Sequence, residues 1–135
     1  MEGFANLPNS FKEVRYSGAM APGVEPDTDL AKGANCQRFA YAVLAHFGLI
    51  VPNFRSSELW DDSTFTQRVD EPEYLDLVLF SSSGLAWGAH VGLCANGNEV
   101  LHLCREVGYP TIWSIKEFDK RERYQTLVGY KRVRG

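Results

Sequence analysis

The stretch "GANCQRFAYAVLAHFG", residues 33–48, carries the clearest helical pattern of the chain. Asn35 is a good N-cap, since its side-chain oxygen can accept a hydrogen bond from a free amide of the first turn. Gly48 is the expected C-terminal stop. Apolar residues at three- and four-residue spacing predict a buried stripe on one face of this helix: Phe39, Ala40, Val43 and Phe47. Cys36, in the first turn, lies on the same stripe.

A cysteine at this place has two interpretations. It is either a small packing residue or a nucleophile, whose thiolate gains from the helix dipole and from the free amides of the first turn. The same amides can form part of an oxyanion hole. The nucleophile interpretation predicts that iodoacetamide labels Cys36 fast below about pH 8, while Cys94 and Cys104, interpreted as packing residues, react slowly. In a non-catalytic binding domain, Cys36 would be buried and inert.

The rest of the chain predicts mostly strands. Residues 49–60 run into a short helical or irregular piece, and residues 61–73 form a polar connection. From Tyr74 onward the pattern favours strands, with a hairpin formed by "AHVGLCA", "NGN" and "EVLHLCRE". Further strands are expected in "YLDLVLF", "PTIWSI" and "TLVGYKRVR", with a polar turn or brief helix in "KEFDKRERY". Helices on one face of an antiparallel meander of about five strands make an α+β domain.

Composition and charge narrow the class of protein. The chain has 135 residues, 44% of them hydrophobic, and a net charge of -3, which suits a single globular domain spanning residues 1–135. The acidic balance predicts neither a nucleic acid nor a membrane as partner, and the basic cluster "KRERY" is interpreted as a solvated face. No apolar run is long enough to span a bilayer. The N-terminus lacks the features of a secretory signal, so we expect synthesis in the cytoplasm without one.

The hairpin brings two histidines together. A three-residue loop, Ala95 to Gly97, suits a type I turn followed by a left-handed glycine. In this register His90 faces His102 directly, with Cβ atoms about 4.5–5.5 Å apart on one face. A two-residue turn would instead place His90 opposite Leu103. A histidine in a strand is commonly structural, but a facing pair can supply a base for a thiol and a group that orients the base.

The same register argues against a metal site. Cys104 would lie roughly 20 Å along the strands from Cys94, at about 3.3 Å per residue. Both thiols therefore cannot bind one zinc ion or form a disulfide. We expect no metal and no cofactor.

Taken in order, these segments resemble the NlpC-type cysteine peptidases, papain-like enzymes that mostly cleave bacterial cell-wall peptides. That family's pattern is D-C-S-G-F at a helix start, G-D-L-V-x-F, H-V-G-I-Y, a second histidine strand and a closing strand. This chain supplies "NCQRFAYAVLAHFG", "LDLVLF", "AHVGLCANGNEVLHL" and "LVGYKRV", and "RYSGA" upstream resembles the family's Y-x-G-G. The resemblance runs from about Tyr16 to Val133. It implies an NlpC-type papain-like fold, with N-terminal helices packed on the sheet.

Residue by residue, the resemblance makes Cys36 the nucleophile, His90 the base and His102 the orienting third residue. Tyr16 becomes a helper at the oxyanion, and Asp76 a structural acid. The chain departs from the family next to the nucleophile, where Asn35, Gln37 and Arg38 replace Asp, Ser and Gly. These residues are candidates for substrate binding, and Arg38 would repel an amine if it pointed into the cleft. Trp87, in the "SSSGLAWG" loop, is a candidate wall of the cleft.

The implied function is a cysteine hydrolase of amide bonds in peptidoglycan stem peptides or cross-links, with a Cys-His-His triad and no cofactor. The implied substrate is a bacterial peptidoglycan peptide, and neither nucleic acid nor membrane is expected as a partner. An injected antibacterial effector, a phage-type lytic enzyme and a cytoplasmic recycling enzyme all fit a chain without a signal peptide. An effector would act in the periplasm or cell wall after non-Sec delivery, and an immunity protein would block its cleft. The alternatives are an amidase or acyltransferase on another substrate, or a binding domain of the same fold.

Overall fold

The structure is a computed structural model that describes residues 4, 7–22, 30, 33–96 and 98–135. Its helices are α1 (Asn9–Lys12), α2 (Cys36–His46), α3 (Ser56–Asp61) and α4 (Ile115–Asp119), followed by a 3-10 turn, η1 (Glu122–Tyr124). Its strands are β1 (Thr66–Val69), β2 (Leu77–Ser81), β3 (His90–Asn96), β4 (Glu99–Leu103), β5 (Pro110–Ser114) and β6 (Thr126–Val133). The predicted α+β class is confirmed.

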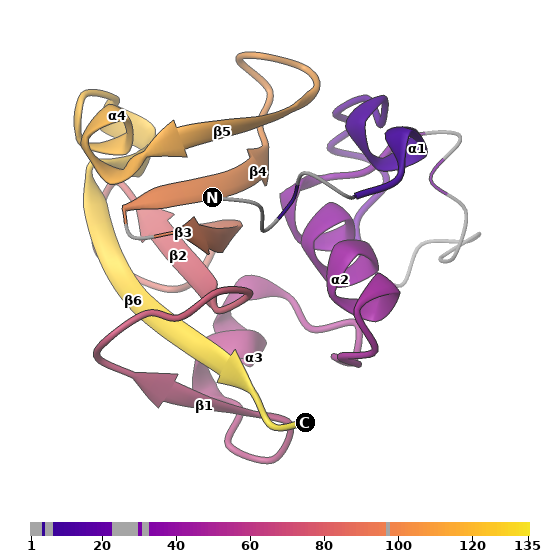
Figure 1. The fold of residues 1–135 in the computed structure, drawn as a ribbon. Coiled ribbons are helices and arrows are strands. Elements are labelled where there is room, and N and C mark those ends of the chain that lie inside the picture. Colours follow the sequence, from indigo (N-terminus) through magenta and orange to yellow (C-terminus); the bar gives the residue numbers. More distant parts are fainter. Residues whose placement is uncertain (1–3, 5–6, 23–29, 31–32, 97) are drawn as a thin grey trace.

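The strands form a six-stranded antiparallel sheet in the order β1-β6-β2-β3-β4-β5 (Figure 1). Strands β2 to β5 make the expected meander, but β6 returns to the other side of β2 and separates it from β1. The sheet therefore has one strand more than the five that the sequence analysis located. The missed strand is β1, with the sequence TQRV. It lies at the edge of the sheet, where Gln67 and Arg68 are exposed, so the apolar pattern of a buried strand is absent.

Helices cover both faces of the sheet. On one face, α2 packs on apolar residues of the central strands, among them Val91, Leu93 and Leu101. On the other face, α4 and η1 cover a second cluster, in which the rings of Phe80 and Phe118 stack with centroids 4.0 Å apart. In Figure 1, α2 and α4 lie on opposite sides of the sheet. The expectation that all helices share one face holds for α2 and is wrong for α4.

Helix α2 begins and ends where its sequence predicts. The Asn35 side chain accepts a hydrogen bond from the backbone N–H of Arg38 at 2.9 Å, which confirms the N-cap. Gly48 follows the helix with a φ of +82°, the left-handed conformation expected of a C-terminal glycine. Phe47 is a correction to the predicted stripe, because it is 38% exposed while Leu44 is fully buried. The helix ends at His46, so Phe47 no longer follows the helical spacing.

The β3–β4 hairpin has a different register from the predicted one. Cys94 pairs with Val100 and Leu93 with Leu101, a shift of two residues from the expected pairing of Cys94 with Asn98. A bulge between Cys94 and Asn96 accompanies the shift. Because side chains alternate with a period of two, a two-residue shift keeps every side chain on its predicted face. The direct pairing of His90 with His102 is therefore wrong, but their shared face is right.

Asp76 is structural, as expected. Its buried carboxylate receives two hydrogen bonds from Arg132, at 2.9 and 2.8 Å, and one from the backbone N–H of Glu73 at 2.7 Å. Such a two-point arginine–carboxylate pair is geometrically specific. It fixes the start of β2 against the end of β6, its neighbour in the sheet.

The sequence also predicts a turn-rich loop in "APGVEPDTD", residues 21–29, most of which lies outside the described residues, as does Gly97 with its expected left-handed conformation. Within the described residues, no helix is both long and apolar enough to cross a bilayer.

Candidate active site

Cys36 is the first residue of α2 and is half-buried. The chain reaches it through Gly33, whose φ is +93° and where a Cβ would lie 2.8 Å from the carbonyl oxygen of Arg15. Glycine alone tolerates both the conformation and the close approach. The approach lets Ala34 form a parallel bridge with Tyr16. The fold therefore brings Tyr16, twenty residues upstream in the sequence, to the turn that carries the thiol.

A pocket of about 230 Å³ opens at this turn. Its lining comes from the start of α2, the start of β3, the residue before α3, and η1: Tyr16, Asn35, Cys36, Gln37, Arg55, Gly88, Ala89, His90, Arg123 and Tyr124. The structure thus brings together the predicted nucleophile, base and oxyanion helper. The predicted third residue, His102, lies behind His90.

The two histidines form a hydrogen-bonded pair. The Nε2 atom of His90 lies 2.8 Å from the Nδ1 atom of His102, and both side chains are buried. One of these two nitrogens carries the shared proton and the other accepts it. Since Nε2 of His90 is occupied in this way, its Nδ1 is the nitrogen left for the thiol.

Aromatic rings surround the pair. The ring of His90 lies 4.6 Å from that of Tyr124, and the ring of His102 lies 4.3 Å from that of Trp113 and 4.7 Å from that of Phe118, measured between centroids. In the described part of the chain, Nε2 of His102 has no hydrogen-bond partner. Burial lowers the pKa of His90 to about 3 and that of His102 to about 2. Both imidazoles are therefore neutral at physiological pH, the state that a general base requires.

The thiol of Cys36 does not have the low pKa expected of a helix N-terminus. Burial raises its pKa to about 11, although the backbone amides of Val91, Gln37 and Cys36 and the charge of Arg123 act in the opposite direction. The helix terminus does favour the thiolate, but burial outweighs it. The resting site therefore holds a neutral thiol beside a neutral imidazole, and not an ion pair.

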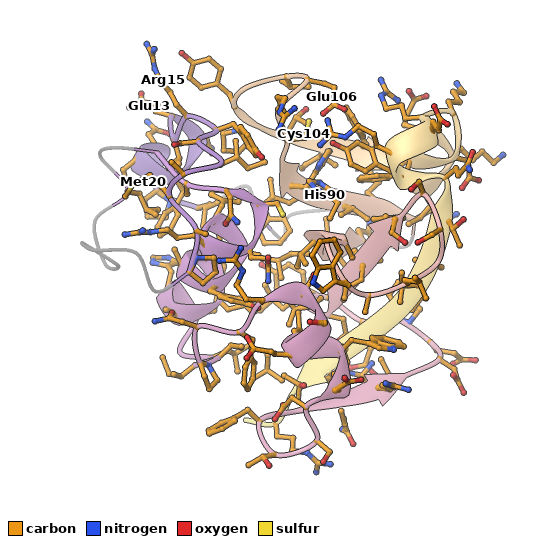
Figure 2. The ribbon with its side chains drawn as sticks, turned by 180° about the vertical axis from the view of Figure 1, so that it is seen from behind. Glu13, Arg15, Met20, His90, Cys104 and Glu106 are labelled. Carbon is orange, nitrogen blue, oxygen red and sulfur yellow. The ribbon has the colours of Figure 1, made fainter. Side chains whose placement is uncertain are left out.

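A group of residues beside His90 was missed in the sequence. The Glu106 carboxylate accepts hydrogen bonds from the hydroxyl of Tyr124 at 2.7 Å and from Arg123 at 2.9 Å. Figure 2 shows Cys104 and Glu106, after the end of β4, near His90, and the charge of Glu106 raises the pKa of His90 against the effect of burial. No local signal could have revealed this group, because Glu106 and Arg123 are brought together by the fold alone and "KRERY" resembles an ordinary solvated turn.

The candidate substrate-binding residues Arg38, Gln37 and Trp87 lie in three different surroundings. Arg38 is buried, donates to the carbonyl of Ala21 at 3.4 Å and lines another cavity, so it neither enters the catalytic pocket nor repels an amine there. Gln37 lines the pocket, but its amide donates to the carbonyl of Phe54 at 2.9 Å. Trp87 is 81% exposed and lines an adjoining cavity that shares Gln37, Arg55 and Gly88 with the catalytic pocket. It borders the cleft beyond the nucleophile.

All three cysteines are free. Cys94 and Cys104 are buried, consistent with packing roles. Among the described residues, no group of three or more histidine, cysteine, aspartate or glutamate side chains is arranged to hold a metal ion.

Neither a family model nor a curated protein matches the sequence. Solved structures do match the fold. The NlpC/p60 domain of the peptidoglycan hydrolase SagA superposes with a TM-score of 0.59 at 15% identity, over 93% of this chain and 92% of that domain. An NLP/P60-family protein similar to lipoprotein from Staphylococcus aureus gives 0.66 at 17% identity, over 99% of this chain and 39% of that one. The peptidoglycan hydrolase RipB from Mycobacterium tuberculosis gives 0.58 at 18% identity, over 94% and 61%.

These likenesses confirm that the chain has the NlpC/p60 fold, as the order of its motifs implies. This chain spans nearly the full length of the SagA domain, but only 39% of the Staphylococcus aureus protein and 61% of RipB.

Proposed function

We propose that this protein is a cysteine hydrolase that cleaves amide bonds in peptidoglycan peptides, with Cys36 as nucleophile, His90 as base and His102 as the residue that orients the base. The observation that carries the proposal is the meeting of a helix N-terminal thiol and a hydrogen-bonded histidine pair at one pocket. The choice of substrate rests on the fold, which this chain shares with proteins described as peptidoglycan hydrolases.

The hydrogen bond between the histidines sets the tautomers that this chemistry needs. For Nδ1 of His90 to accept the thiol proton, its Nε2 must carry a proton and donate it to Nδ1 of His102. His102 is then protonated on Nε2, a buried atom without a hydrogen-bond partner among the described residues. Because the pKa of His102 is far below neutral, His102 stays an acceptor and does not compete for the proton.

The reaction would begin with transfer of the Cys36 proton to Nδ1 of His90 as sulfur attacks the scissile carbonyl carbon. The backbone N–H of Cys36 and the hydroxyl of Tyr16 would stabilise the oxyanion. The imidazolium would next protonate the departing amine, which leaves a thioester on Cys36. Water, deprotonated by His90, would hydrolyse the thioester and restore the thiol.

The proposal is tested by digesting purified sacculi and isolated muropeptides with the wild-type protein and with Cys36→Ala, and identifying the products by mass. Wild type should release new peptide fragments and the variant none. If the folded wild-type protein leaves both substrates intact, the cell-wall substrate is excluded. Cleavage by Cys36→Ala at the wild-type rate would exclude the nucleophile.

A further inference from the structure

Both charged side chains among the described residues that line the catalytic pocket are positive, and Glu106 pairs with one of them, Arg123, without lining the pocket itself. Among the described residues that line the catalytic pocket, Arg55 and Arg123 are charged, whereas no aspartate or glutamate is present. The pocket is smaller than the ~300–1,000 Å³ of typical small-molecule sites, so any occupant lies close to both guanidinium groups. The charge of Arg123 acts on both reacting groups, since it lowers the pKa of Cys36 and that of His90.

Arg123 is anchored by two neighbouring residues, Glu106 and Tyr124. One of its terminal nitrogens donates to Glu106 at 2.9 Å, and its guanidinium carbon lies 5.3 Å from the ring centroid of Tyr124. Its side chain is still 52% exposed. A guanidinium has five N–H donors, so this anchoring leaves donors available to a ligand.

Arg55, the second arginine of the pocket lining, lies immediately before α3. Its backbone N–H donates to Glu58 at 2.8 Å, which fixes the start of the helix. Its side chain is exposed and lines both the catalytic pocket and the adjoining cavity that contains Trp87 and Glu58. Among the described residues, no carboxylate forms a salt bridge with the Arg55 guanidinium.

We propose that Arg55 and Arg123 bind a free carboxylate of the substrate, so that the enzyme selects peptides with an anionic group next to the scissile amide over peptides in which that group is amidated. The planar guanidinium fork matches a carboxylate and gives short, charge-assisted hydrogen bonds. An ammonium group, by contrast, would meet two positive charges and no carboxylate in this pocket. This proposal adds a substrate preference to the proposed function, and its test with peptides rests on that function.

The pocket charge can be tested without a substrate, using two reagents that alkylate thiols with loss of iodide. Iodoacetate carries a carboxylate and iodoacetamide a neutral amide, and both react with the same thiolate. Mass spectrometry gives the alkylation rate of Cys36 with each reagent. The rate with iodoacetate divided by the rate with iodoacetamide, normalised to the same quotient for N-acetylcysteine, reports the attraction of a carboxylate to the pocket. Because both rates depend equally on the thiol pKa, the ratio is insensitive to a change in that pKa.

We expect the normalised ratio to be about tenfold in the wild type at low salt and to fall toward one as salt screens the charges. Arg55→Gln and Arg123→Gln should each lower it about threefold, and Arg55→Lys should retain part of it. Arg68→Gln is the matched control, because Arg68 is 54% exposed, pairs with Asp61 and does not line the pocket. A wild-type ratio near one, or equal ratios in all variants, would overturn the proposal.

The peptide arm compares two muropeptides that differ only by a free or amidated carboxylate beside the cleaved bond. The free form should have a kcat/KM about tenfold higher, and this preference should shrink in both arginine variants. Equal cleavage of both peptides would overturn the carboxylate preference while leaving the hydrolase intact. A raised alkylation ratio with neither peptide cleaved would uphold the anionic pocket and contradict the peptidoglycan substrate.

Discussion

His90 and His102 are joined by a hydrogen bond of 2.8 Å although they do not face each other across the hairpin. The register of β3 and β4 continues from the pair of Leu93 with Leu101, which places Gly92 beside His102. A Cβ on Gly92 would lie 3.3 Å from Cβ of His102 and 2.5 Å from Cγ1 of Val100. Because Gly92 has no side chain, the imidazole of His102 has space to extend toward His90 on the same face of the sheet.

This relationship predicts that Gly92→Ala damages both stability and catalysis. The new methyl group collides with Val100 and with the backbone of Leu101, so β4 must move away from β3. Overpacking of this kind costs about 1–3 kcal/mol, and the movement separates the histidines. We expect a lower urea midpoint and at least a tenfold loss of kcat/KM per folded molecule.

The control for this variant is Gly129→Ala, where a Cβ would lie 2.4 Å from Cη2 of Trp60. This collision also destabilises the fold, but it occurs on β6, away from the histidine pair. Gly129→Ala should therefore lose stability and keep its activity per folded molecule. If both variants retain activity, the spacing at Gly92 does not position His102.

Replacing the histidines should rank their roles. His90→Ala removes the base, a loss of about 10²–10⁴-fold in kcat, whereas His102→Ala removes an orienting group and should cost less. His102→Gln should recover part of the loss, because its side-chain carbonyl can accept the proton of His90 Nε2. Single-turnover rates on a muropeptide measure the order. A larger loss in His102→Ala than in His90→Ala, with both variants folded, would mean that the roles are exchanged.

The features that sequence alone could predict are local or periodic. The cap by Asn35 and the placement of Cys36 follow from adjacent residues, and the shared face of the histidines follows from the period of a strand. Because of that period, the two-residue error in register did not change the prediction that the two histidines share one face of the sheet. The position of β6 between β1 and β2, and the pairing of Glu106 with Arg123, depend on contacts between distant segments. The sequence could not show that Arg38 points away from the catalytic pocket, because the direction of a helix side chain depends on which face of the helix the sheet covers.

Stability should fall as the pH decreases from about 6.5 to 5. Burial depresses the pKa of His90 to about 3 and of His102 to about 2, so in this window the unfolded chain binds protons that the folded chain does not. The free energy of unfolding then decreases as the pH falls, by up to about 2 kcal/mol per histidine. The carboxyl groups of Asp62 and Glu106, whose pKa values are lowered in the fold, lose their contribution only at more acidic pH.

Urea denaturation at pH 7.5, 6.5, 5.5 and 5.0 measures this dependence. His102→Gln should show a shallower slope over the same range, because it has one fewer buried histidine. A wild-type unfolding free energy that stays constant from pH 6.5 to 5 would contradict the neutral, buried state of the pair.

Glu106→Gln should weaken the base. The carboxylate raises the pKa of His90 and stabilises the imidazolium that forms as the thiol loses its proton, so its removal should lower kcat by about tenfold. Arg123→Gln should instead act mainly on KM for a carboxylate-bearing peptide, which separates the two residues. Glu117→Gln is the control, because Glu117 pairs with Lys120 and Arg121 and does not line the catalytic pocket. An unchanged kcat in Glu106→Gln would remove Glu106 from the catalytic step.

The pH dependence of alkylation should reveal how the nucleophile is activated. A thiolate–imidazolium pair in the resting enzyme would give a labelling rate that is already constant near neutral pH. Because burial raises the pKa of Cys36 to about 11, the rate with iodoacetamide should instead rise about tenfold per pH unit from pH 7 to 10. Cys94 and Cys104 are 4% and 0% exposed and should react far more slowly at every pH.

A plateau in the Cys36 rate by pH 7 would contradict this picture and show that the ion pair exists before substrate binds. A continuous rise, together with cleavage of peptides at neutral pH, would mean that the thiol loses its proton only as the carbonyl arrives. His90 would then act as a general base within the reaction, and its hydrogen bond to His102 would keep Nδ1 free to receive the proton.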